Sequence, residues 1–288
     1  MKLLQQFLPG DCDIYEVGDS HNGSLCCHEE AEEEMVSKVE KNPIGYLGFM
    51  GDAAETVFIN HPYYDPESLK KDGNSNVIKT DIQCEVVAKR YSPIADKLLF
   101  WLMGNHEYRV LKTHNMVDMI LKDKNIDRRE IGCDFAVKFT ILDKKGKPKL
   151  KLYAHHGSGL SNNNAGTERQ KRTNSLVALQ RKLSPMAGDC ICQSIGHTHK
   201  LLVAEPLSRL YLVDEGGKIK QKYIKTINND GYIDPENRWY CNTGSFFKSQ
   251  MIGFDSYAER NMYPPTELGY IVIHIRDYKV ESIEKVIV

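Results

Sequence analysis

The sequence lacks an apolar run long enough to cross a membrane. Its first residues, MKLLQQFLPGDCDIYEV, also lack the apolar core and the small-residue cleavage site of a signal peptide. We therefore expect a cytoplasmic protein with no membrane partner. Net charge is nearly absent as well, because 38 basic and 39 acidic residues leave a formal charge of −1. This balance excludes a general attraction to nucleic acid, so any such binding must come from a local patch.

No CxxC pair occurs among the eight cysteines, which lie mostly inside apolar runs such as CICQ, YCNT and IGCDFAV. This pattern favours reduced, buried thiols over disulfides or a zinc knuckle. Internal repeats and low-complexity blocks are absent too, and no change of composition separates two cores. We therefore predict one domain over residues 1–288.

The composition suits a globular protein with a substantial core, since 41% of the 288 residues are hydrophobic and 27% are charged. Strand-like and helix-like segments alternate in the first half, and strands dominate beyond residue 130. The residues at 28–42 predict a helix with one apolar face, and its glutamates are interpreted as a solvated face. A second helix is expected over 80–92 and a third over 108–125, whereas 56–79 is interpreted as an irregular excursion. These patterns predict an α/β fold.

Five apolar, strand-like segments end in a glycine next to polar residues that can bind a ligand. In α/β sheets, ligands bind beyond the carboxyl ends of the strands, and glycine lets the chain turn sharply there. Any one of these endings is weak evidence, and a pair such as GHTH also fits exposed loop histidines. The endings are GDSH (18–21), GD (51–52), GNHE (104–107), HHG (155–157) and GHTH (196–199).

Taken together, the order DxH, GD, GNHE, HG and GHTH resembles the calcineurin-like metallophosphoesterase superfamily. The resemblance covers residues from about 15 to 250, and GDAAE, GNHEYR, HHGSG and NTGSF are most similar to bacterial and phage-type members. It implies a sandwich of two β-sheets flanked by helices, in four layers (αββα). It also implies two divalent metal ions, with Mn²⁺ first and Fe or Zn²⁺ as alternatives, because mixed nitrogen and oxygen ligands suit these metals.

The resemblance assigns seven ligands to the two ions. Asp19, His21 and His199 would hold one ion, and Asn105, His156 and His197 the other, with Asp52 bridging both. A carboxylate suits this bridge, because its two oxygens can each reach an ion. His155 stands beside His156, and only the histidine before the glycine is expected to bind metal.

Three further residues receive roles from the resemblance. His106 would contact the phosphate and help the leaving oxygen depart, where an imidazole can stabilise developing charge. Glu55 stands where the family often has an Asp that orients this histidine, so its orienting role is an expectation despite its longer side chain. Arg109 is a candidate for binding a substrate phosphate, although an ordinary helix arginine fits equally well.

The expected function is a binuclear-metal-dependent phosphoesterase that uses a metal-activated hydroxide. A phosphodiesterase acting on nucleotide or nucleic-acid phosphodiesters is favoured. A phosphomonoesterase or protein phosphatase is the alternative within the enzyme class, and a catalytically inactive metal-binding scaffold is the alternative outside it. The partner is therefore a phosphate-ester substrate, including a nucleotide or nucleic acid.

Overall fold

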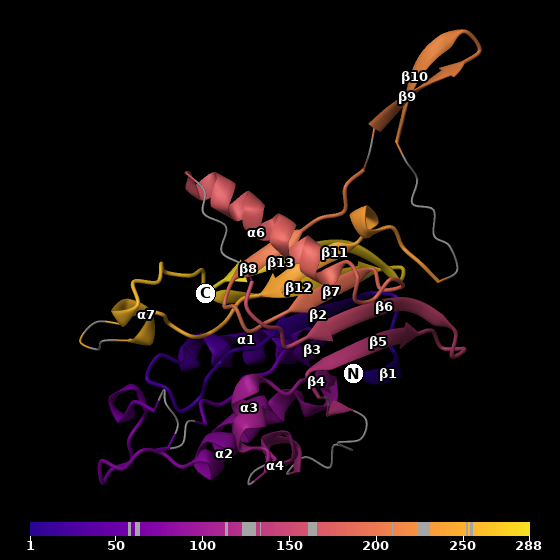
Figure 1. Ribbon diagram of the computed structural model, residues 1–288. Helices are drawn as coiled ribbons and strands as arrows, with labels where there is room; N and C mark the ends of the chain where they lie inside the picture. The colour runs from indigo at the N-terminus through magenta and orange to yellow at the C-terminus, as the bar shows by residue number, and fades with distance from the viewer. Residues whose placement is uncertain are drawn as a thin grey trace.

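Two β-sheets pack face to face at the centre of the molecule, and helices cover their outer faces (Figure 1). The structure is a computed structural model that describes residues 1–56, 59–60, 64–112, 115–122, 131–132, 134–160, 166–208, 210–223, 231–251, 253 and 256–288. The helix–sheet–sheet–helix sandwich predicted from the sequence is confirmed.

One sheet has five strands in the order β13-β12-β2-β3-β4. The adjacent strands β2, β3 and β4 are parallel, so their carboxyl ends lie at one edge of this sheet. Strand β12 pairs antiparallel with both β2 and β13. The bounds are β2 (Cys12–Val17), β3 (Gly45–Phe49), β4 (Leu98–Trp101), β12 (Gly269–Arg276) and β13 (Lys279–Ile287).

The other sheet has six strands in the order β1-β5-β6-β7-β11-β8. Here β6 runs parallel to β7, and β7 parallel to β11, while β5 and β6 form an antiparallel hairpin. The bounds are β1 (Lys2–Phe7), β5 (Ala136–Leu142), β6 (Pro148–His155), β7 (Cys192–Ile195), β8 (Leu201–Ala204) and β11 (Trp239–Thr243).

The longer helices bury one apolar stripe each against the sheets. The helices α1 (Glu29–Lys41), α2 (Thr80–Tyr91) and α4 (Met116–Lys122) share a core with the five-stranded sheet, and α6 (Glu168–Leu183) packs on the six-stranded sheet. A third core, between the sheets, joins both inner faces. The remaining helical segments are short: α3 (Asn105–Val110), α7 (Tyr257–Arg260), η1 (Pro66–Ser68), η2 (Ser92–Lys97) and η3 (Pro235–Asn237).

Two expectations about helices need correction. The acidic run of α1 is not entirely a solvated face, because Glu32 is fully buried and accepts hydrogen bonds from Ser20 and Tyr91. The helix expected over 108–125 is two helices, α3 and α4, and the first of them begins at Asn105 inside the GNHE motif. Residues 113–114 and 123–125 of that expectation, and 57–58 and 61–63 of the expected irregular excursion, lie outside the described residues.

A two-stranded ribbon, β9 (Leu210–Glu215) and β10 (Lys218–Tyr223), projects from the body of the molecule (Figure 1). Within the described residues, seven cysteines are buried and free, in agreement with the expectation of reduced thiols. No helix in the described part of the chain combines the length and the apolar character needed to cross a membrane.

Candidate metal centre

The five strand ends identified from the sequence converge at one edge of the sandwich. The loops after β2, β3 and β4 come from the five-stranded sheet, and the ends of β6 and β7 come from the six-stranded sheet. Backbone hydrogen bonds join the first two loops, since the amide of Asp19 donates to Gly51 at 2.9 Å and that of His21 to Asp52 at 3.0 Å.

The backbone of this region is strained where the predicted ligands lie. Asp19, His21, Asp52, His197 and His199 all have left-handed φ angles, between 50° and 66°. Such conformations are uncommon outside glycine and cost about 1–3 kcal/mol each. Five of the seven predicted ligands are strained in this way. Strained backbone conformations cluster at functional sites, so their concentration here indicates such a site.

Glycines allow the loops to approach one another closely. A Cβ atom on Gly104 would lie 2.0 Å from Oδ1 of Asp52, and one on Gly196 would lie 2.7 Å from Oδ2 of Asp19. No larger residue fits at either position without moving a carboxylate. The glycines of GNHE and GHTH therefore place backbone directly against the two aspartates.

The first group of candidate ligands joins Asp19, His21 and His199. Ligand atoms of these three residues lie within 4.8 Å of one another. Nε2 of His199 is 3.3 Å from Nε2 of His21 and 3.5 Å from Oδ1 of Asp19. Nδ1 of His21 donates to Glu55 at 2.8 Å, which leaves Nε2 to face the group.

The second group joins Asn105, His156 and His197. The amide oxygen of Asn105 lies 2.7 Å from Nδ1 of His197 and 3.0 Å from Nε2 of His156. His156 donates from Nδ1 to the carbonyl of Met50 at 2.9 Å, so its Nε2 also faces inward. A histidine held through its other nitrogen is the usual arrangement of a metal ligand.

Asp52 lies between the two groups. Its Oδ1 accepts a hydrogen bond from the backbone amide of His106 at 2.9 Å. Its Oδ2 is 3.3 Å from Nε2 of His156, 4.0 Å from Nε2 of His21 and 3.0 Å from the amide oxygen of Asn105. Oδ2 is therefore the atom that faces both groups, whereas the sequence had suggested one oxygen for each ion.

The buried carboxylates raise the pKa values of two neighbouring histidines and so favour positive charge at this place. Burial would lower the pKa of His21, but the charge and hydrogen bond of Glu55, followed by Asp52 and Asp19, raise it to about 9. Burial likewise opposes protonation of His156, yet Asp52 and then Asp19 raise its pKa to about 10. The pKa of Asp52 itself lies well below its usual value, since its neighbouring histidines outweigh burial.

The donor atoms of these residues suit divalent cations. The amide oxygen of Asn105 faces only acceptor atoms, and turning the amide over would bring its NH₂ group to them instead. A cation among Asn105, His156, His197 and Asp52 favours the oxygen-inward orientation. The donors are imidazole nitrogen together with carboxylate and amide oxygen, the mixed set that Mn²⁺, Fe and Zn²⁺ accept.

His106 lies beside both groups without belonging to the predicted ligand set. Its Nδ1 donates to the carbonyl of Glu55, which directs Nε2 away from that contact. Its ligand atoms also come within 4.8 Å of those of His21 and Asp52. Burial lowers its pKa more than the charges of Glu55 and Asp52 raise it.

Arg109 stands at the rim of the site next to His106. Its Nη1 is 3.5 Å from Nε2 of His106, and its Nη2 is 3.2 Å from the amide nitrogen of Asn105. The side chain is exposed, so the guanidinium can reach an anion that enters from solvent.

Glu55 differs from its expected arrangement. Its carboxylate binds Nδ1 of His21 at 2.8 Å and stays 3.8 Å from Nδ1 of His106. The extra methylene of glutamate carries the carboxylate past His106, which binds the backbone carbonyl of the same residue instead. Glu55 thus contacts both histidines, but its charge orients His21.

The adjacent histidines 155 and 156 lie at the end of β6 and differ in burial. His156 is fully buried in the second group, whereas Nδ1 of His155 accepts from the amide of Gly157 at 2.7 Å. His155 belongs to none of the three groups of ligand atoms found among the described residues.

Two residues of the site were missed from the sequence. The buried carboxylate of Glu107 accepts from the amides of Asp52, Ala53 and Gly104 at 2.7 to 3.0 Å, so it ties two ligand loops together. Its place as the last letter of GNHE was the available signal. The ring of Phe247 lies 5.0 Å from that of His21 and 5.4 Å from that of His199, and no sequence pattern marked it.

Fold and site together define an α/β sandwich protein with candidate metal-binding clusters at one sheet edge. Neither a protein-family model nor a curated protein sequence matches the chain. Three solved structures are similar to it over 96% of its length. They are a predicted phosphoesterase from Streptococcus pneumoniae TIGR4 (13% identity, 98% of that chain, TM-score 0.31), a metallophosphoesterase from Sphaerobacter thermophilus (11%, 88%, 0.35) and the calcineurin-like phosphoesterase YfkN from Bacillus subtilis (14%, 90%, 0.37).

Proposed function

We propose that the protein is a binuclear-metal-dependent phosphoesterase of the calcineurin-like metallophosphoesterase type. The observation that carries the proposal is the sharing of Asp52 by two groups of ligands. Oδ2 of Asp52 faces His21 of the first group and His156 of the second. Five strained ligand residues and the match to the motif order support it.

The first ion would be held by Asp19, His21, His199 and Asp52. The second would be held by Asn105, His156, His197 and Asp52. When bound, two such divalent ions would supply charge neutralisation and an activated water to a phosphate ester.

The protein's own residues would orient the ester and stabilise its leaving group. Arg109 offers a bidentate guanidinium to a phosphate oxygen at the rim of the site. His106 presents Nε2 toward the same space, where its protonated form would donate to the departing oxygen. Phe247 places an apolar ring beside the first group, which suits an ester with an organic substituent.

A phosphodiester of a nucleotide or nucleic acid is the substrate class we propose. The sequence motifs are most similar to those of bacterial and phage-type members, in which such substrates are common. The basic helix α6 follows the HHGSG loop and offers exposed arginine and lysine side chains for a second phosphate.

The decisive experiment measures metal stoichiometry and activity together. Protein reconstituted with Mn²⁺ should approach two ions per chain by elemental analysis and should hydrolyse a chromogenic aryl phosphodiester. Asp52→Asn should weaken the binding of both ions, because the shared ligand loses its charge. Asp19→Asn should chiefly weaken the binding of one ion.

A stoichiometry that saturates at one ion over a wide range of Mn²⁺ would overturn the binuclear arrangement. Two bound ions without hydrolysis of any phosphate ester would instead favour the metal-binding scaffold. Asp189→Asn is a suitable control, since its ion pairs with Lys138 and Lys151 lie apart from the ligand groups.

A further inference from the structure

The loop that carries Asp19 and His21 is anchored by a buried carboxylate from α1. Oε1 of Glu32 accepts a hydrogen bond from the hydroxyl of Ser20 at 2.6 Å, and Oε2 accepts one from the side-chain amide of Asn22 at 3.2 Å. These two residues flank His21 on either side. The side chain of Glu32 therefore holds the loop on both sides of a candidate ligand.

Helix α2 completes the anchor with a cation and a hydroxyl. Arg90 donates from Nη1 to Oε2 of Glu32 at 2.5 Å and also donates to the amide oxygen of Asn22. Tyr91 donates its hydroxyl to Oε1 of Glu32 at 2.7 Å. Glu32 thus accepts four hydrogen bonds while fully buried, and Arg90 balances its charge.

The anchor extends to the loop that carries Asp52. The side-chain amide of Asn22 donates to the carbonyl of Ala53 at 3.0 Å, and the backbone amide of Asn22 donates to the same carbonyl at 2.9 Å. The amide of Glu55 returns a bond to the carbonyl of Asn22 at 2.9 Å. A displacement of Asn22 would therefore move the bridging aspartate and the carboxylate that orients His21.

We propose that Glu32 and Arg90 form a clamp that positions Asp19 and His21 for the first metal ion. The inference rests on the proposed function and adds two positioning residues from α1 and α2. Neither residue touches the ion or the substrate, so the clamp acts through the loop of residues 18–22. Apart from Asp52, the second ion relies on loops from β4, β6 and β7, which have no hydrogen bond to Glu32 or Arg90 among the described contacts.

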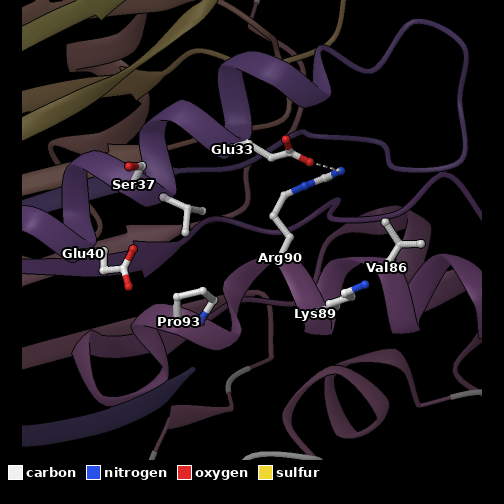
Figure 2. A pocket seen from close by; sticks show the side chains of 8 residues that line it. Glu33, Ser37, Glu40, Val86, Lys89, Arg90 and Pro93 are labelled. Atoms are coloured by element: carbon white, nitrogen blue, oxygen red, sulfur yellow. Dashed lines mark ion pairs between the residues drawn. The ribbon is translucent and has the colours of Figure 1, made fainter.

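The outer end of the clamp reaches the surface between α1 and α2. Figure 2 shows Arg90 extending toward α1 in a groove that also contains Lys89, Val86 and Pro93. Its Nη2 is 2.7 Å from Glu29 and 3.6 Å from Glu33, the ion pair drawn in the figure. The guanidinium therefore spans the space from solvent-facing glutamates to the buried Glu32.

The test compares the binding of the two Mn²⁺ ions in wild type and in Glu32→Gln, after circular dichroism has verified folding. The variant keeps the size of the side chain. It replaces one carboxylate oxygen, which accepts hydrogen bonds, with an NH₂ group that cannot accept them. We expect the first ion to bind about 10–100-fold more weakly, the usual effect of removing a supporting partner, and the second ion to lose less affinity because it shares only Asp52 with the anchored loops. A folded variant that binds both ions with wild-type affinity would overturn the clamp.

A second measurement needs no metal, so the clamp and the proposed function can fail separately. In metal-free protein, the Nδ1 proton that His21 donates to Glu55 should give a slowly exchanging imidazole resonance, and Glu32→Gln should lose or broaden it. An unchanged resonance would overturn the clamp. A wild type that binds fewer than two ions would overturn the binuclear function, and the imidazole resonance would then still decide the clamp.

Two further variants guard against simple unfolding. Tyr91→Phe removes one of the four hydrogen bonds without removing a charge, and it should weaken the same ion to a smaller degree. Asp189→Asn breaks a half-buried ion pair on the six-stranded sheet, and it should leave both ion affinities unchanged. A similar loss of metal in Asp189→Asn would attribute the effect of Glu32→Gln to general destabilisation and overturn the clamp.

Discussion

His106 is tied into the site by its backbone and its ring separately. The backbone amide holds Oδ1 of Asp52, while the ring binds the carbonyl of Glu55. Removing the ring therefore leaves the contact to Asp52 in place. This separation makes the catalytic role of the side chain testable without dismantling the ligand groups.

We expect His106→Ala to keep its fold and both ions while losing most of its turnover. General acid–base groups typically contribute about 10²–10⁴-fold, and the loss should be smaller for an activated aryl leaving group, which needs little help to depart. The measurement is kcat on aryl and alkyl phosphodiesters together with metal analysis. Loss of an ion from this variant would show that His106 is a ligand, and the proposed role would then be wrong.

Glu16 lies outside the ligand groups, and its buried environment predicts how the stability of the protein depends on pH. It is fully buried in β2, and neither carboxylate oxygen has a hydrogen-bond partner in the described structure. Burial raises its pKa from 4.5 to about 7, with the nearby Ser194 hydroxyl acting in the opposite direction. The folded protein therefore holds a proton on Glu16 that the unfolded chain releases near pH 4.5.

The stability of the wild type should fall relative to Glu16→Gln as the pH rises from about 4.5 to 7. In this window the folded state binds more protons than the unfolded state, so the free energy of unfolding decreases with pH, in total by about 3 kcal/mol. Urea unfolding of both proteins in chelator at pH 5 and pH 8 measures the difference. An identical pH dependence in the two proteins would mean that Glu16 is ionised in the fold.

The side chains that the sequence proposes as ligands lie close together in the structure, and their role as ligands stays a prediction, whereas their supporting partners were not recognised. Asp19, Asp52 and His197 stand next to glycine at strand ends, a local pattern that can be read along the chain. Glu32 and Glu107 gain their roles from contacts with distant loops, and a glutamate on a helix has no local mark of burial. The carboxylate of Glu55 lies closer to His21 than to His106, because its extra methylene lengthens its reach, and its orienting role toward His106 stays a prediction.

At the scale of elements, prediction succeeded where one face of a segment is buried. The apolar stripe of α1 was recognised, and so was the dominance of strands beyond residue 130, which includes the final pair β12–β13. Strand β1 was missed, because it is largely exposed and gains its partner β5 from more than a hundred residues away. The ribbon β9–β10 was missed too, since its residues are almost all exposed and its pattern lacks a buried face.

The ribbon should contribute little to the stability of the body. An isolated two-stranded hairpin is marginally stable in water, and within the described residues β9 and β10 pair only with each other. Ile219→Ala in β10, where the side chain is 77% exposed, should change the free energy of unfolding by no more than about 0.5 kcal/mol. The matched Ile273→Ala in β12, at 0% exposure, should cost about 2–5 kcal/mol.

Denaturant unfolding of the two isoleucine variants beside wild type provides the comparison. Equal losses in the two proteins would mean that the ribbon packs on the body in solution. The prediction concerns stability alone, so a ribbon that serves substrate binding would still leave the Ile219 variant as stable as wild type.

At the scale of the whole molecule, charge sets how a polyanionic substrate would be recognised. The net charge of −1 gives no general attraction to nucleic acid. Positive charge near the site comes from Arg109 at its rim, and Lys182 of α6 donates to Ser158 in the loop after His156. Recognition of a polyanionic substrate should therefore depend on a few local contacts with phosphate. The single domain over residues 1–288 stays a prediction.

We expect phosphodiesters to be preferred over phosphomonoesters, with oligonucleotide binding that is modest and weakens as salt is added. A protein that neutralises only a few phosphates releases few counterions, so the logarithm of affinity should fall with a shallow slope against the logarithm of salt concentration. The measurement is kcat/KM on matched aryl monoesters and diesters, followed by short DNA and RNA oligonucleotides at several salt concentrations. Arg109→Ala should lower kcat/KM on every substrate, while Arg169→Ala on α6 should matter only for substrates with a second phosphate. A clear monoester preference without cleavage of any nucleotide diester would contradict the proposed substrate class and leave the metal centre untouched.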